Sequence, residues 1–280
     1  MMHEGVFPGF GGGASVFADR PHATTVKAML INTAYRYPLS SESGTDFTRF
    51  TQGWGLPDIA ALYAVRDNIF IVNETDLLLD FGGPEYNTKS YNFVVASGDP
   101  ALRVTLVYAD PPGNPTSGVT TVNDLTLRVT SLGGVACYFG NHGLLSGNWS
   151  TASQNCNLET SPDADHVNTV ENVFVSNPQP GTWTITVFAD LVAQDGHVET
   201  PAEPNCAGVE PPFCDADYAL VISSAPRPRG RCCHGTECLP TGLVRCSYEA
   251  PEDCDDPWDD WNSEATCADE CFWCPLGPVP

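Results

Sequence analysis

The sequence is poor in basic residues and has no long apolar run. Among its 280 residues, twelve Lys and Arg stand against 35 Asp and Glu, so the formal net charge at pH 7 is −23. Such a charge repels phosphate backbones and anionic lipid surfaces, which excludes nucleic acid and membrane surfaces as expected partners. No stretch approaches the ~18 consecutive apolar residues that a membrane-spanning helix needs, so no membrane span is expected.

A secretory signal is also missing, whereas cysteine is plentiful. Residues 1–8 contain neither the basic segment nor the apolar core of a signal peptide. Twelve cysteines in a loop-rich acidic chain favour disulfides, which persist in oxidising compartments. The protein is therefore expected to be extracellular or to lie in the secretory lumen, and the start of the sequence is expected to be truncated.

The chain divides into three parts by its residue pattern, and we expect a domain for each part. Residues 1–66 contain a glycine-rich loop and two short helices, expected at 26–34 and 58–65, where apolar residues recur three or four positions apart. Residues 67–225 are rich in short β-forming runs. Residues 226–280 read as an extended linker followed by a cysteine-rich module.

The β-rich part predicts a sandwich. Leu125, Leu127 and Val129 alternate with polar residues, as in a strand with one buried and one solvated face. Long proline-containing loops suit a jelly roll, and the lack of helical crossovers argues against a parallel sheet. We predict a mainly β fold, a jelly-roll-like antiparallel β-sandwich with a short N-terminal helical segment. At least seven strands are expected, at residues 69–72, 91–96, 102–108, 125–130, 170–175, 182–188 and 218–222.

The cysteines predict two kinds of disulfide region. Proximity along the chain predicts two bonds in the sandwich, which join Cys137 with Cys156 and Cys206 with Cys214. The other eight cysteines lie between Cys232 and Cys274, in a tail with too little apolar surface for a core of its own, so we expect disulfides to staple it. Zinc is the alternative at Cys271-x-x-Cys274, although a second close pair at a suitable distance is missing.

Acidic and amide side chains in the loops of the sandwich predict calcium binding. Calcium takes about six to eight oxygen ligands, and clustered Asp, Asn and Glu supply them. The alternative is that these residues stand in turns, where Asp and Asn bond to their own backbone. The candidate ligands are Asp110, Asn123, Asp124, Asp163, Asp165 and Glu171.

Several ordered motifs give the chain a family resemblance over roughly residues 22–224. Residues 26–34 and 52–62 resemble the last two helices of the subtilases, the subtilisin-like serine proteases. Four further segments are similar to the C-terminal β-sandwich of subtilases related to oxidatively stable alkaline proteases, at 102–113, 122–127, 170–173 and 178–187. The resemblance implies that the sandwich packs on a peptidase domain and that the helical segment is the remnant of that α/β domain.

The resemblance also implies that the catalytic residues precede this chain. The family's Gly-Thr-Ser-Met-Ala-x-Pro serine motif and its Asp and His motifs do not occur, and Ser15 lacks their context. No triad motif contains any of the six histidines, which are His3, His22, His142, His166, His197 and His234. No catalytic residue is expected, and the isolated chain is expected to be inactive.

We therefore expect the non-catalytic C-terminal region of a secreted subtilisin-like serine endopeptidase, whose sandwich stabilises the protease domain or aids substrate binding. Its partner would be the subtilase catalytic domain, in the same parent chain or in trans. The alternative is a calcium-supported extracellular adhesion module that has lost its protease domain and binds a protein or glycan through the cysteine-rich tail. Helices in residues 1–66 would expose apolar faces, so we expect them to pack on the sandwich, to self-associate or to remain mobile.

Overall fold

A computed structural model of the chain shows two compact units, Met1–Ala225 and Pro226–Pro280. The first unit takes in both the helical segment and the β-rich part. The structure describes residues 1–11, 13, 15–35, 49–79, 88–113, 116, 121–145, 147–158, 161–194, 215–224, 230–238, 244–249 and 260–262.

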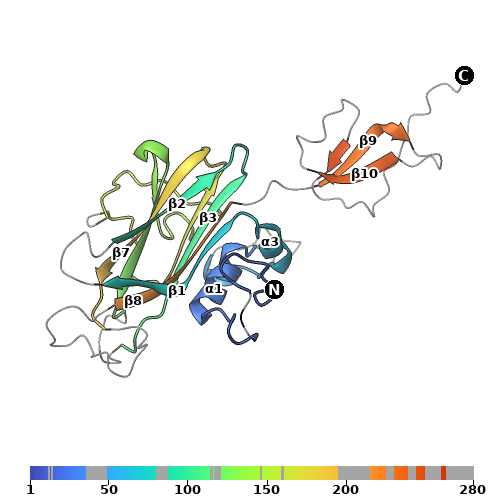
Figure 1. Ribbon diagram of the computed structural model, residues 1–280. Coiled ribbons are helices and arrows are strands. Elements are labelled where there is room, and N and C mark those ends of the chain that lie inside the picture. The colour runs from blue at the N-terminus through green and yellow to red at the C-terminus, as the bar shows by residue number, and fades with distance from the viewer. Residues whose placement is uncertain are drawn as a thin grey trace, which may run out of the picture. The chain divides into compact units, whose positions relative to one another are not determined.

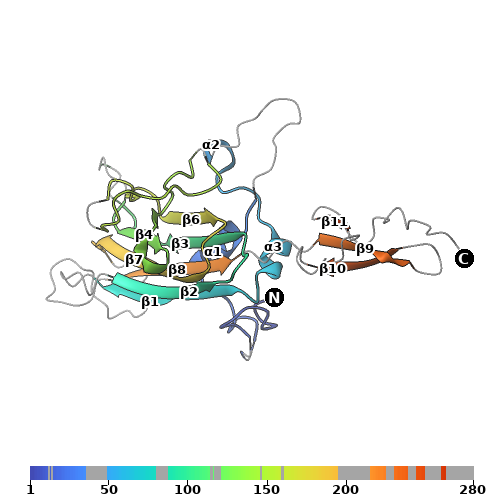
Figure 2. The same cartoon turned by 90° about the horizontal axis from the view of Figure 1, so that it is seen from above.

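The first unit is built on two four-stranded antiparallel sheets (Figures 1 and 2). Their strand orders are β1-β8-β3-β6 and β2-β7-β4-β5, and most successive strands alternate between the sheets, which is the order of an eight-stranded jelly roll. The predicted mainly β sandwich is thus confirmed. The strands are β1 (Ile69–Leu79), β2 (Thr88–Val95), β3 (Ala101–Tyr108), β4 (Asp124–Thr130), β5 (Cys137–Phe139), β6 (Val170–Ser176), β7 (Gly181–Leu191) and β8 (Asp215–Ser224).

Alternate residues of both sheets form the core between them. Leu125, Leu127 and Val129 of β4 are fully buried there, as their spacing predicts. The expectation that the other face of this strand is solvated is wrong at Thr126, which is also fully buried. Its hydroxyl donates a hydrogen bond to the carboxylate of Asp190, which satisfies the polar group away from water.

All seven expected strands are present, and further strands were missed. β1 continues to Leu79, beyond the expected end at residue 72, and the three residues of β5 are too few for alternation to be recognised. In the second unit, β9 (Gly230–Cys238) pairs with β10 (Val244–Glu249) and with β11 (Asp260–Asn262), both antiparallel. The pair Cys206 and Cys214 falls outside the described residues, and the disulfide and zinc expectations for the tail stay predictions.

A disulfide connects Cys137 of β5 to Cys156, one of the two pairs expected in the sandwich. Cys137 is fully buried, so the bond is anchored in the core. The bond therefore fastens the connection between β5 and β6 to the edge of the β2-β7-β4-β5 sheet. This connection carries Asp165 and His166.

The helices are short: α1 (Ala23–Asn32), α2 (Arg49–Gln52) and α3 (Ile59–Ala64). The side chain of Asp58 caps α3 by accepting a hydrogen bond of 2.8 Å from the backbone N–H of Ala61. The expected helix at 26–34 begins and ends earlier, since Tyr35 already pairs with Leu56 in an isolated β-bridge. In the described part of the chain, no helix is long and apolar enough to cross a membrane.

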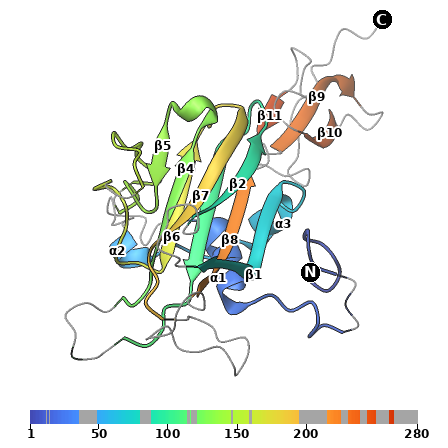
Figure 3. The same cartoon turned by 60° about the vertical axis from the view of Figure 1, so that its left-hand side comes forward.

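Helices α1 and α3 lie together on one side of the sandwich (Figures 1 and 3). Ala28 and Met29 of α1 and Leu62 of α3 are buried in one apolar cluster with Val107 of β3 and Val221 of β8. These two strand residues point away from the core, so the β1-β8-β3-β6 sheet is covered on both faces. The helices therefore pack on the sandwich, one of the three outcomes expected for residues 1–66.

A buried polar network fixes α1 on this sheet. The amide group of Asn32 donates to the hydroxyl of Thr105 on β3 at 3.2 Å and accepts from the hydroxyl of Ser223 on β8 at 2.5 Å. Thr105 in turn donates to the side-chain oxygen of Asn172 on β6 at 2.7 Å. Because all four residues are buried, each of these bonds satisfies a group that would be costly to leave unpaired. The network gives the helix a single position on three strands.

Candidate functional site

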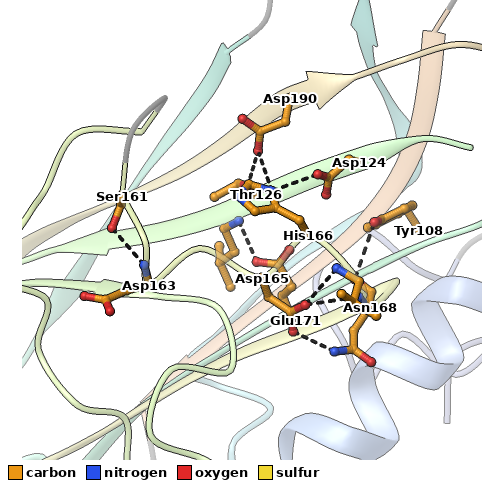
Figure 4. Close-up of polar contacts among 12 residues, drawn as sticks. Tyr108, Asp124, Thr126, Ser161, Asp163, Asp165, His166, Asn168, Glu171 and Asp190 are labelled. Atoms are coloured by element: carbon orange, nitrogen blue, oxygen red, sulfur yellow. Dashed lines mark hydrogen bonds and ion pairs between the residues drawn. The ribbon is translucent and has the colours of Figure 1, made fainter. Parts of the chain in front are cut away.

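A group of acidic side chains gathers where β4 begins and β7 ends (Figure 4). Asp124 is the first residue of β4, and Asp190 lies near the end of β7. The connection that precedes β6 contributes Asp165 and His166, and β6 itself contributes Glu171. We call these five residues the acidic cluster. Since they are distant in sequence, it is the fold of the sandwich that assembles them.

A β-bulge sets the position of Asp190 relative to Asp124. Asp124 pairs with Leu191, whereas the next residue of β4, Leu125, pairs with Ala189, so Asp190 is the extra residue of the bulge. Leu125 and Ala189 belong to the core. The two aspartates therefore lie on the outer face of the β2-β7-β4-β5 sheet, which the connection between β5 and β6 partly covers.

The imidazole of His166 faces both aspartates. Its Nδ1 atom lies 2.8 Å from Asp124 Oδ2 and 3.8 Å from Asp190 Oδ2, and one possible ligand atom from each of the three residues lies within 4.8 Å of the others. Burial raises the pKa of the Asp124 carboxyl, and the hydrogen bond with His166 acts in the opposite direction. Within the described residues, the buried Oδ1 atom of Asp124 has no hydrogen-bond partner.

Glu171 is the deepest member of the acidic cluster and is fully buried. Its Oε2 atom accepts a hydrogen bond of 2.8 Å from the backbone N–H of Leu127, and its Oε1 atom has no hydrogen-bond partner among the described residues. Because β5 ends at Phe139, the carboxylate accepts the hydrogen bond from β4 that a backbone carbonyl of a longer β5 would accept. Burial raises the pKa of Glu171 well above its ordinary value, and the nearby charges of Asp165, Asp124 and Asp190 raise it further.

Asp165 shapes the turn that presents His166. Its Oδ1 atom accepts hydrogen bonds from the backbone N–H groups of Val167 at 3.0 Å and Asn168 at 3.1 Å, as in an Asx turn. Its Oδ2 atom accepts a bond of 2.6 Å from the side chain of Asn141. With its carboxylate held on both sides, Asp165 fixes the backbone next to His166.

The six expected calcium ligands differ in what they contact. Asp124, Asp165 and Glu171 meet in the acidic cluster. Asp110 instead accepts bonds from the backbone N–H groups of residues 122 and 123, Asn123 bonds to the backbone of residues 193 and 194, and Asp163 contacts His142 and Ser153.

Sequence reasoning missed two members of the cluster, His166 and Asp190. The unpartnered oxygens of Asp124 and Glu171 suit a cation, while the nitrogen of His166 is a ligand that calcium does not favour. Calcium binding therefore stays a prediction. The available signal for Asp190 was its place at the end of a predicted strand, close in sequence to the polar segment that follows.

A serine, an aspartate and a histidine do meet near the cluster, but not in the order that catalysis needs. Asp163 accepts a hydrogen bond of 2.7 Å from Ser153 and lies 3.3 Å from Nε2 of His142. The other ring nitrogen of His142 is 2.9 Å from the carbonyl oxygen of Thr151. In a catalytic triad the histidine stands between the serine and the aspartate and takes the serine proton. Here the aspartate stands between them, so the serine is not activated.

The buried Glu171 predicts how stability changes with pH. Because its pKa is raised in the folded state, the folded protein binds an additional proton between the unfolded value of about 4.3 and the folded value. Stability contributed by this proton is present at low pH and is lost as pH rises through the folded pKa. Glu171→Gln is therefore expected to flatten the decline in unfolding free energy as pH rises above about 4.3, measured by urea unfolding in EDTA.

The control for this measurement is Asp67→Asn, because Asp67 is an exposed carboxylate with a side chain 79% accessible. Its pH profile is expected to match that of the wild type. An unchanged slope in Glu171→Gln would contradict the assignment of the pH dependence to the buried carboxyl.

No protein-family model matches this chain, whereas a similarity to a known protein is found. A Dictyostelium discoideum protein named serine protease/ABC transporter B family protein tagA is 28% identical over 171 residues. The alignment covers 60% of this chain and 9% of the relative, so the chain spans a small part of that protein's length. The chain is thus similar to part of a protein whose name includes a serine protease.

Proposed function

We propose that this chain is the non-catalytic C-terminal region of a secreted subtilisin-like serine endopeptidase, in which the sandwich stabilises the protease domain or helps to bind its substrate. The similarity to a much longer protein named as a serine protease supports this proposal. The observation that carries it is a set of large apolar side chains left exposed on the helical segment.

These exposed side chains lie on α3 and on the adjoining bridge. Ile59 and Tyr63 stand one turn apart on α3, with 51% and 48% of their surface accessible. Tyr35 and Leu56, which pair in the β-bridge, are 48% and 42% accessible. Apolar side chains gathered in this way favour a protein partner, and a peptidase domain that continues the helical segment would cover them.

A pocket at the junction of the helical segment and the sandwich supports the role in substrate binding. Arg49 of α2 and the nearby Trp54 line the pocket, with the guanidinium carbon of Arg49 4.5 Å from the centre of the Trp54 ring. His142, Leu144 and Val167 also line it. The pocket combines apolar walls with polar groups, as binding sites for small molecules or peptide side chains do.

The proposal is tested by reading the coding sequence upstream of Met1 and by an activity measurement. An intact set of serine, histidine and aspartate motifs is expected upstream, and the purified chain is expected to show neither peptide hydrolysis nor labelling by a fluorophosphonate. An upstream sequence without these motifs would favour the calcium-supported binding module. Inhibitor-sensitive hydrolysis by the purified chain would overturn the claim that it is non-catalytic.

The apolar surface is tested with the separately produced upstream domain. Ile59→Asp is expected to weaken its binding to the chain by more than tenfold, because a charge would be buried in an apolar contact. Val94→Asp is the matched control, because Val94 is also apolar and exposed, with 66% of its surface accessible, but lies on β2 of the sandwich. Equal binding by both variants would exclude α3 as the contact surface.

A further inference from the structure

We propose that Asp124, Asp190 and His166 bind one divalent transition-metal ion of the zinc class on the outer face of the β2-β7-β4-β5 sheet. The three residues come from β4, from the bulge of β7 and from the turn before β6. An ion held by all three would connect two strands with the long connection that crosses them (Figure 4).

The positions of the three side chains fit a shared ion. Nitrogen and oxygen ligands lie about 2.0–2.2 Å from zinc, so two ligand atoms of one ion are at most ~4.3 Å apart. His166 Nδ1 already lies 2.8 Å from the oxygen of Asp124 and 3.8 Å from that of Asp190. Ordinary side-chain rotation is enough to replace the contact between His166 and Asp124 by two bonds to a metal.

The accessibility of the group allows an ion to enter and keep a water ligand. The side chains of Asp124 and Asp190 are 14% and 17% accessible, whereas that of His166 is 52% accessible. The carboxylates are thus held firmly by the sandwich, and the imidazole closes the site from the solvent side. Three protein ligands with an open fourth position are a common zinc arrangement.

The surroundings of the site provide an independent reason to expect a cation. Glu171 is fully buried, its Oε1 atom has no hydrogen-bond partner among the described residues, and its carboxyl interacts electrostatically with Asp124, Asp165 and Asp190. The buried Oδ1 atom of Asp124 has no such partner either. Because no hydrogen-bond donor among the described residues reaches either oxygen, a divalent cation beside them would supply the positive charge that their surroundings lack.

The donor atoms decide the class of ion. Calcium and magnesium prefer oxygen ligands alone, while zinc and its neighbours accept imidazole nitrogen together with carboxylate oxygen. His166 Nδ1 is the atom that faces the two aspartates. A histidine directed into a carboxylate pair therefore favours the zinc class over calcium at this site.

The test uses the full-length chain with its disulfides intact, stripped of metal by EDTA and titrated with zinc chloride in a calorimeter. His166→Ala is expected to abolish one equivalent of binding. Loss of groups that merely orient a ligand costs about 10–100-fold in affinity, so the loss of the ligand itself is expected to cost more than ~100-fold. Cobalt in place of zinc is expected to give the absorption bands of a four-coordinate ion, and these bands are expected to disappear in His166→Ala.

His142→Ala is the matched control, because this histidine also lies beside an aspartate, at 3.3 Å from Asp163. It is expected to bind zinc as the wild type does. Zinc binding that persists unchanged in His166→Ala would overturn the proposal, and so would tight calcium binding with no zinc binding. Circular dichroism of His166→Ala ensures that a lost signal does not reflect unfolding, and Asp190→Asn offers a second variant if it does.

Discussion

Replacing Gly140 by alanine is expected to destabilise the first unit by about 3 kcal/mol, at the upper end of what overpacking usually costs. A Cβ atom at this position would lie 2.0 Å from Oε2 of Glu171 and 2.6 Å from its Cβ atom. Neither neighbour can withdraw easily, because the Glu171 side chain is fully buried and bonded to the backbone of Leu127. The cost therefore comes from a steric clash, and it would also displace the innermost carboxylate of the acidic cluster.

Urea unfolding followed by tryptophan fluorescence measures this loss. Gly134→Ala is the control, because Gly134 has a φ of 71° but no atom within 4 Å of an added Cβ. Its expected cost is about 1 kcal/mol, from the left-handed backbone conformation alone. Equal losses in the two variants would show that contact with Glu171 is not what requires a glycine at position 140.

Removing the disulfide by the double substitution Cys137→Ala and Cys156→Ala is expected to cost about 3 kcal/mol of unfolding free energy. The bond closes a loop between residues 19 positions apart, which restricts the unfolded chain and so favours the folded state. The cavity left by the buried sulfur of Cys137 adds to the loss. Unfolding of wild type and double variant in urea without reductant measures the difference.

The control for the disulfide is the single variant Cys156→Ala, which leaves Cys137 in place in the core. It is expected to lose the cross-link contribution while retaining the packing of that sulfur, so it should fall between the wild type and the double variant. A double variant within ~0.5 kcal/mol of the wild type would contradict a stabilising role of the bond.

The fold could be predicted because its strands carry a strong local signal. Apolar alternation in β4 and the β-branched runs of β3 and β8 identify strands whatever their partners. β5 was missed because its three residues are too few to show apolar alternation. α2 was missed because its four residues are too few to show a helical repeat of apolar positions. The burial of Thr126 could not be foreseen, since it depends on the carboxylate of Asp190, which is 64 positions away in sequence.

The candidate site was predictable only in part, for a related reason. Asp124, Asp165 and Glu171 were proposed because acidic and amide residues cluster in the segments that adjoin the expected strands. In the run from Val170 to Val175, Glu171 has the same parity as Val173, so the pattern itself places it on the inward face. Asp190 joins the cluster through a β-bulge, which depends on the register of β4 against β7. His166 joins it through a turn whose Asp165 carboxylate is also held by Asn141, 24 positions away in sequence.

The placement of α1 on the sandwich has a practical consequence for dividing the protein into exchangeable modules. Ala219 and Val221 of β8, together with the hydroxyl of Thr105, meet the helix rather than water. A recombinant fragment that begins after residue 66 would expose these apolar and polar groups of the β1-β8-β3-β6 sheet to water. The smallest transplantable piece therefore begins upstream of His22, and a protein engineer who fused the jelly roll to another enzyme would need to carry the helix along with it.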